Sequence, residues 1–256
     1  MKRTLLLLLA LLPLFSCQPE KPEKTPQKDV AFIAIQSFSS KAQIGTNLLP
    51  AWSEGDKVGI RSESVEEPAE FVLVSGAGYT TAAFEGWKPE GERFIAFFPS
   101  TAKCDGITFR GVLDTKVGHA VPDHPLGALP MWGTSRDLTK LKLTALFGIL
   151  RLNLKGDVKL QSLMLDAGVP VSGQFLCTLE SGTVAMIGGA NIIMMDVAGT
   201  ELLATKDTPF YFILPPGEYD SIKFTVTDVA GDISFLYFDD VEIKAGRYTL
   251  VSETLE

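Results

Sequence analysis

The feature that most constrains this fold is a series of short apolar segments, bounded by turn-forming residues, that runs along almost the whole chain. The segments are rich in aromatic and β-branched side chains and recur about every 10 residues, which is typical of an all-β sandwich. Residues 221–227 show the pattern most clearly, because Ile222, Phe224 and Val226 alternate with polar residues and would share one face of a strand. Strands are therefore expected at residues 30–36, 57–61, 71–74, 81–84, 93–98, 107–112, 141–147, 149–154, 159–165, 174–179, 210–214, 221–227, 235–238 and 248–251.

Residues 114–137 interrupt this rhythm. They are rich in proline and glycine, which predicts a long loop. A continuous apolar block follows at residues 141–154, and its Leu-Arg-Leu-Asn-Leu alternation and internal Gly148 favour one or two strands over a helix. We expect two β-sandwich domains in tandem, an N-terminal domain at residues 30–140 and a C-terminal domain at residues 141–256.

The stretch WSEGDKVGI at residues 52–60 predicts a turn that leads into a strand. Gly55 can adopt a positive φ, and the Asp56 side chain can bond nearby backbone. Val58 and Ile60 then alternate into a sheet, and Trp52 is placed to cover one end of the core. No neighbouring residues need this stretch for chemistry, so we interpret it as structural.

The first sixteen residues are typical of a secretory signal peptide. Lys2 and Arg3 precede an uncharged, leucine-rich run at residues 5–15, which as a helix would span about 16 Å, far less than the roughly 30 Å of a bilayer core. The segment Leu14-Phe15-Ser16-Cys17 resembles a bacterial lipobox. We therefore predict cleavage between Ser16 and Cys17 and acylation, including palmitate, of Cys17.

Residues 17–29 are predicted to form a tether. Prolines and alternating charges in QPEKPEKTPQK cannot build a core, so this segment is expected to be semi-extended. Each buried methylene of an acyl chain contributes about 0.8 kcal/mol to membrane binding, so a doubly or triply acylated Cys17 would hold the protein lastingly. The expected location is the outer membrane or cell surface, with the body anchored by lipid.

Charge and cysteine content narrow the choice of partner. The formal net charge is -8, and removing residues 1–16 takes away two positive charges, which leaves about -10. Nucleic acid is not an expected partner, because its binding depends on basic patches. Cys104 and Cys177 remain after acylation of Cys17, and the sequence leaves open whether they form a disulfide.

No motif in the sequence predicts a cofactor, a metal ion or catalysis. His119 and His124 flank Asp123 but lack further ligands at metal-binding spacing. Residues 75–80 resemble a phosphate loop only faintly and are interpreted as a hairpin turn. Aspartates near residues 228–240 could hold calcium, although acidic residues are common in sandwich turns.

Several segments, taken in order, resemble motifs of the fimbrillin-like family of cell-surface lipoproteins and type V pilus subunits from Bacteroides-type bacteria. The stretch at residues 52–60 is similar to the family's W-x-x-G-D strand start. The other matching segments are AAFEG at 82–86, FIAFFP at 94–99, LPMWG at 129–133, LFGILRLNLKG at 146–156, LPPGEY at 214–219 and AGRY at 245–248.

The resemblance implies two transthyretin-like, Greek-key β-sandwich domains and a non-catalytic role at the surface. It also implies that other pilus subunits could be partners through strand exchange, after proteolysis frees a groove. Lys41 is the candidate processing site, since family pilins are cut after a basic residue, and the strand at residues 30–36 would be displaced. The chain ends eight residues after Tyr248, which leaves little sequence for a donor strand and favours an anchor, tip or accessory subunit.

The sequence also bears on two other functions. A surface lipoprotein of a polysaccharide-uptake system would need exposed aromatic rings for stacking on sugars, and Trp87 and Trp132, both in loop-like sequence contexts, are the candidates. The expected ligand of such a surface protein is a host ligand or a glycan. An enzyme is not expected, because the sequence contains no nucleophile elbow, zinc-protease helix or dinucleotide fingerprint.

Overall fold

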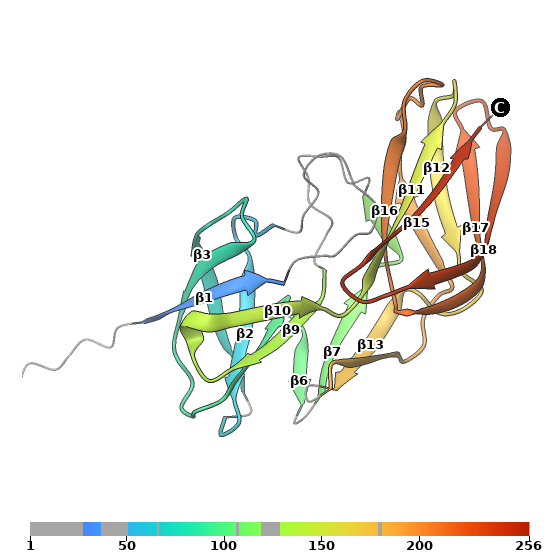
Figure 1. Cartoon of the computed structure of the whole chain (residues 1–256). Helices are drawn as coiled ribbons and strands as arrows, with labels where there is room; N and C mark the ends of the chain where they lie inside the picture. The colour runs from blue at the N-terminus through green and yellow to red at the C-terminus, as the bar shows by residue number, and fades with distance from the viewer. Residues whose placement is uncertain are drawn as a thin grey trace, which may run out of the picture.

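A computed structural model describes residues 28–36, 51–65, 67–105, 108–118, 129–178 and 181–255. Within these residues the regular structure is almost entirely strand, which confirms the predicted all-β class (Figure 1). The strands are β1 (Asp29–Ile35), β2 (Lys57–Ser62), β3 (Ala69–Ser75), β4 (Thr81–Gly86), β5 (Phe94–Phe98), β6 (Lys103–Asp105), β7 (Thr108–Leu113), β8 (Lys116–Gly118), β9 (Met131–Ser135), β10 (Leu141–Ala145), β11 (Gly148–Lys155), β12 (Leu160–Asp166), β13 (Gly173–Thr178), β14 (Thr183–Met186), β15 (Ile192–Asp196), β16 (Thr208–Leu214), β17 (Gly217–Asp228), β18 (Ile233–Ile243) and β19 (Tyr248–Thr254).

The first half of the chain forms a closed barrel with the strand order β1-β10-β9-β5-β2-β3-β4. Most neighbouring strands are antiparallel, but β1 and β10 run parallel. Alternate side chains point inward and create a core rich in aromatic rings, including Trp52, Phe71, Phe84 and Phe97. A short 3-10 helix, η1 (Leu138–Lys140), leads into β10. Its N-cap is Asp137, whose Oδ1 accepts a hydrogen bond from Thr139 N at 2.9 Å.

The second half forms a two-layer sandwich. One layer is the sheet β16-β11-β19, and the other is the sheet β18-β17-β12-β15-β8. The inward residues of both layers are nearly all apolar and form a second core, for example Leu152 of β11, Phe212 of β16 and Phe224 of β17. The rings of Phe212 and Phe224 lie 5.5 Å apart across this core.

A third group of strands joins the two halves. Strand β7 pairs with β13 at the centre of the sheet β14-β13-β7-β6, with β6 on the other side of β7 and β14 on the other side of β13. Strand β8 pairs with β15 of the sandwich, whereas β10 belongs to the barrel. Strands β7 and β8, which precede residue 140, thus pair with strands of the second half, whereas β10, which follows it, pairs within the barrel. The division into domains at residues 30–140 and 141–256 stays a prediction.

The long loop predicted for residues 114–137 is wrong in two places. Residues Lys116–Gly118 form β8, and Met131–Ser135 form β9, which sits between β5 and β10 in the barrel. The proline and glycine content of the segment predicted a loop, and β8 and β9 are too short to show a clear strand pattern against it. Their hydrogen bonds come from neighbours far away in sequence, so the local composition carries little trace of them.

The turn between the two layers of the sandwich is fixed by Tyr219. This side chain is buried, and its hydroxyl donates a hydrogen bond to Pro215 O at 2.7 Å, four residues upstream. Burial also raises the pKa of Tyr219, so the hydroxyl stays protonated and remains a donor.

We expect Tyr219→Phe to lower the free energy of unfolding by about 0.5–1.5 kcal/mol, because it removes one buried hydrogen bond and leaves Pro215 O without its donor. Urea denaturation followed by circular dichroism would measure the change. Tyr237→Phe, at an exposed residue, is the matched control and should change stability by much less. Equal effects of the two substitutions would contradict the assignment.

Candidate strand-exchange site

The candidate functional site is strand β1 and the groove that it fills. Strand β1 pairs antiparallel with β4, where Ala31 lies opposite Phe84, and parallel with β10, where Ile33 lies opposite Leu141. Figure 1 shows β1, in blue, beside the yellow-green β10, although more than 100 residues separate them in sequence. Removing β1 would open the barrel and leave β4 and β10 each with an unpaired edge.

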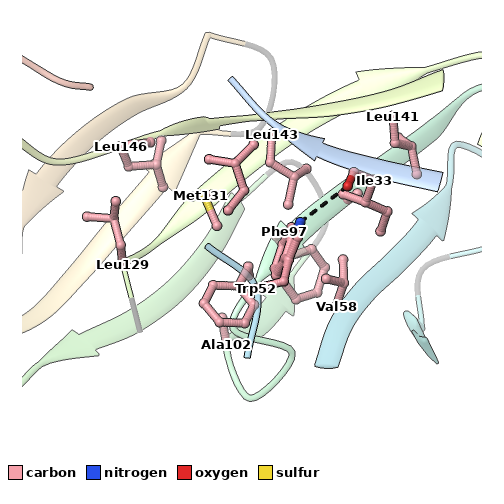
Figure 2. Close-up of a cluster of buried hydrophobic side chains, with 14 of the residues drawn as sticks. Ile33, Trp52, Val58, Phe97, Ala102, Leu129, Met131, Leu141, Leu143 and Leu146 are labelled. Carbon is pink, nitrogen blue, oxygen red and sulfur yellow. Dashed lines mark hydrogen bonds between the residues drawn. The ribbon is translucent and has the colours of Figure 1, made fainter. Parts of the chain in front are cut away.

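The inward face of β1 is fully apolar. Ala31, Ile33 and Ile35 are buried in the barrel core. Figure 2 shows Ile33 in the same cluster as Leu141 and Val58. Burying an isoleucine side chain stabilises a fold by about 1.5–3 kcal/mol, so the two isoleucines account for much of the binding of this strand. An emptied groove would therefore be an apolar slot suited to another strand with alternating apolar residues.

Trp52 ties the loop before β2 to the middle of β1. Its Nε1 donates a hydrogen bond to Ile33 O at 3.2 Å, drawn as the dashed line in Figure 2. Its ring packs edge-to-face against Phe84 at 4.9 Å and Phe98 at 5.4 Å. The structural interpretation of this tryptophan is confirmed, and the structure adds its contact with β1.

The turn that follows Trp52 also forms as the sequence predicts. Ser53 N donates to Asp56 Oδ2 at 2.7 Å, Asp56 N donates to Ser53 O at 3.1 Å, and Gly55 has a φ of 85°. Partial burial raises the pKa of Asp56, and the hydrogen bond from Ser53 N opposes that shift. This turn directly follows Trp52 and helps to hold the Trp52 indole against β1.

The outward face of β1 is apolar as well. Val30 and Phe32 are 42% and 47% exposed. A strand of an antiparallel sheet with one face in water normally alternates apolar and polar residues. Strand β1 therefore has few polar groups that would hold it in water once detached, which favours its staying in the barrel or entering another apolar site.

The predicted processing residues cannot be placed on this site. Ser16, Cys17 and Lys41 lie outside the described residues, so acylation, signal-peptide cleavage and cutting after Lys41 stay predictions. Residue 41 follows β1 by six positions in the sequence. A cut there would leave β1 attached to the barrel only by non-covalent contacts.

The two tryptophans chosen as stacking candidates do not come together. Trp87 is half-exposed and directly follows Gly86, which pairs with Asp29 at the start of β1. Trp132 pairs with Thr144, whose Oγ1 bonds the Gln36 side chain just beyond the other end of β1. The seven residues of β1 span about 23 Å, so the two rings cannot contact one sugar together.

The loop context expected for Trp132 is wrong, because this residue lies in strand β9. Its indole packs directly against residue 182 of the second half, where a Cβ atom would lie 2.5 Å from Trp132 Nε1. This packing makes Trp132 part of the contact between the barrel and the rest of the chain.

Other chemistry is sparse in the described part of the chain. Those residues hold no group of three His, Cys, Asp or Glu side chains that could bind a metal ion, and His119 and His124 lie outside them. Asp228 is used as a turn residue, since its Oδ1 accepts from Ala230 N at 2.8 Å and Asp232 N at 2.9 Å. In the same ranges no helix is long and apolar enough to cross a membrane.

Cys177 is a free, buried thiol, and burial raises its pKa to about 12. Cys104 of β6 and Cys177 of β13 both pair with Phe109 of β7, on opposite sides. Their Cα atoms are therefore two strand spacings apart, about 10 Å, whereas a disulfide needs less than about 7 Å. The disulfide left open by the sequence does not form in this structure.

Comparison with solved structures identifies the fold. A protein from Bacteroides ovatus proposed to act in cell adhesion superposes with a TM-score of 0.59 over 90% of this chain and 93% of its own, at 12% identity. A second such protein, from Bacteroides fragilis, gives 0.44 over 88% and 93% at 8% identity. The tip fimbrial protein of Porphyromonas gingivalis gives 0.39 over 82% of each chain at 13% identity.

The sequence itself matches no family model and no curated protein. The relationship therefore rests on the fold, which is shared with the Bacteroides ovatus protein over 90% of this chain. The chain thus has an all-β fold like that of the Bacteroides ovatus protein, in agreement with the fimbrillin-like family that its sequence motifs resemble.

Proposed function

We propose that this chain is a non-catalytic, lipid-anchored surface protein of the fimbrillin-like type, acting as an anchor, tip or accessory subunit of a pilus or as an adhesive subunit. Its partners are the outer membrane, reached through acylated Cys17, and other pilus subunits. The observation that carries the proposal is the closed barrel, in which β1 pairs with β4 and β10 and buries Ala31, Ile33 and Ile35.

The fold supports the surface role. The Bacteroides ovatus protein with the same fold is described as a cell adhesion protein, and the superposition covers 93% of its chain. The sequence supports the anchor independently, because the lipobox-like segment ends at Cys17 and a charged, proline-rich tether follows it. Neither argument depends on catalytic or metal-binding residues.

The glycan-uptake alternative gains no support from the positions of its candidate residues. Trp132 is committed to packing against residue 182, and Trp87 lies at the far end of β1. A sugar-stacking site normally gathers aromatic rings with polar groups on one open surface.

The packing of β1 supports the form of the protein that is not cut after Lys41. Both isoleucines of β1 are buried, and Trp52 Nε1 donates a hydrogen bond to Ile33 O in the middle of the strand. Cutting after residue 41 would also separate the lipid-bearing tether from the body, since β1 and Cys17 lie on the same side of the cut. An anchored subunit therefore keeps this peptide bond intact.

The anchor is tested by metabolic labelling with a palmitate analogue in cells that express the wild type or Cys17→Ala. We expect the wild type to be labelled and to sediment with membranes, and the variant to be unlabelled and released. Wild-type protein that is unlabelled and soluble would refute the anchor.

The uncut form is tested by limited trypsin digestion of the mature protein, followed by gels run without heating. We expect β1 to stay bound and the protein to run as a monomer, as does a Lys41→Gln control. Ladders that resist SDS and form only in the trypsin-treated wild type would show that the chain polymerises by strand exchange.

A further inference from the structure

The hairpin of β17 and β18, residues 217–243, carries apolar side chains on a surface that nothing in the proposed function uses. We call residues 217–243 the acidic hairpin. Figure 1 shows it at the side of the molecule away from the barrel. Strand β18 is the last strand of its sheet, so one of its edges has no neighbouring strand in that sheet.

Three large side chains stand in a column on the outer face of β18. Ile233, Phe235 and Tyr237 alternate along the strand and are 57%, 53% and 61% exposed. Leu236 and Phe238 point to the opposite face of the strand and pack on the sandwich core. The outward residues are therefore not needed to build that core, and an exposed apolar cluster of this kind is typical of a binding surface.

The column continues across the sheet as a contact surface. Phe235 lies opposite Thr225, Thr225 opposite Met164, and Met164 opposite Met194, which is 41% exposed. Lys223 Nζ sits 4.4 Å from the centre of the Phe235 ring, a cation–π contact that holds the ring in place. Aromatic and methionine side chains are enriched in protein–protein interfaces.

The charge around this column is strongly negative. Residues 217–243 contain seven carboxylate side chains and one lysine, a net charge of -6 in a chain whose total is -8. Six of the seven belong to exposed residues, namely Glu218, Asp220, Asp232, Asp239, Asp240 and Glu242. Glu242 is paired with Lys244 at 2.7 Å, and Asp228 is engaged in the hairpin turn.

We propose that the acidic hairpin is a docking surface for a basic protein partner, whose lysine or arginine side chains surround an apolar centre. The column of Ile233, Phe235 and Tyr237 supplies the apolar contact, and the carboxylates attract and orient the partner. This inference goes beyond the proposed function and does not depend on lipid anchoring or on strand exchange.

The same charges exclude other occupants. A second copy of this chain would bring two surfaces of charge -6 together, and like charges oppose such a contact. Nucleic acids and sulfated glycans are repelled for the same reason. Strand addition to the edge of β18 is hindered at Asp239 and Asp240, because charged residues on an edge strand discourage pairing and Asp240 has a φ of 53°.

The experiment uses the mature chain and two labelled 12-residue probe peptides. One alternates lysine with valine and tyrosine, and the other has glutamate at every lysine position. Fluorescence anisotropy at about 50 mM and about 500 mM salt measures affinity, and sedimentation measures self-association. We expect the lysine peptide alone to bind, and more weakly at high salt, because screening shortens the reach of the charges.

Two variants locate the site. Phe235→Ser with Tyr237→Ser should weaken binding of the lysine peptide at least tenfold, and Asp232→Asn with Asp239→Asn and Asp240→Asn should weaken it and reduce its salt dependence. The matched controls lie elsewhere: Leu250→Ser, at a residue of similar exposure, and Glu54→Gln with Asp157→Asn and Glu201→Gln. These should bind as the wild type does.

Each other outcome overturns the proposal. These outcomes are no binding of the lysine peptide, equal binding of the glutamate peptide, or equal losses in the control variants. Self-association abolished by the aromatic variant would identify a second copy as the occupant, and array binding to a neutral glycan lost in that variant would identify a sugar. If the aromatic variant fails to fold by circular dichroism, the asparagine variant decides, because it removes charge without removing packing.

Discussion

Replacement of Ile33 by alanine is expected to lower the free energy of unfolding by about 2–5 kcal/mol. Ile33 is fully buried at the centre of β1, where its carbonyl also accepts the Trp52 hydrogen bond. The substitution removes methyl groups and leaves a cavity that the surrounding barrel strands cannot fill. Urea denaturation followed by tryptophan fluorescence measures the loss, since Trp52 packs beside this strand.

The control for this prediction is Phe32→Ala, the adjacent residue on the outer face of β1. Phe32 is 47% exposed, so its truncation should cost much less despite the larger side chain. The pair also tests the strand-exchange site: Ile33→Ala should make β1 easier to release and more accessible to trypsin, whereas Phe32→Ala should not. Equal destabilisation by the two variants would show that β1 is not held by its inward face.

Replacement of Phe147 by alanine is expected to cost about 3–5 kcal/mol. Phe147 is fully buried between β10 of the barrel and β11 of the sandwich. Its ring meets Phe175 edge-to-face at 5.0 Å, and Phe175 belongs to the sheet that joins the two halves. The loss combines apolar burial with an aromatic pair that contributes about 0.5–1.5 kcal/mol beyond its buried area.

Phe147→Ala should also affect the cooperativity of unfolding. Because this ring packs where barrel and sandwich meet, we expect thermal unfolding of the variant, followed by calorimetry, to broaden or to split into two transitions. Val112→Ala, at an exposed residue on β7, is the control and should leave a transition like that of the wild type. A single sharp transition at the wild-type temperature in Phe147→Ala would contradict this role.

Much of the fold could be predicted from local sequence because local physics determines it. The alternation of Ile222, Phe224 and Val226 puts one face of β17 in the core, as the structure confirms. Turn chemistry at Ser53, Gly55 and Asp56 needs only neighbouring backbone, so it too could be recognised in advance.

The candidate site could be predicted only in part. The apolar run at residues 30–36 identified β1 as a strand, but nothing in it identified β10 as its parallel neighbour. Leu141 and Leu143 complete the groove, although they lie more than 100 residues after β1 in the sequence. The residue pattern of a strand does not specify which distant strand completes the sheet.

What the sequence determined by itself is therefore the all-β class, the buried face of β17, the turn beside Trp52 and the negative charge of the hairpin at residues 217–243. These depend on interactions between residues close together in the chain or on composition alone. Tertiary structure decided the closure of the barrel by β1 and β10, the sheet shared between the halves, the short strands β8 and β9 and the separation of Trp87 from Trp132. Each of these requires hydrogen bonds or packing between segments far apart in sequence, and such pairings are selected by the fit of the whole core rather than by any local pattern.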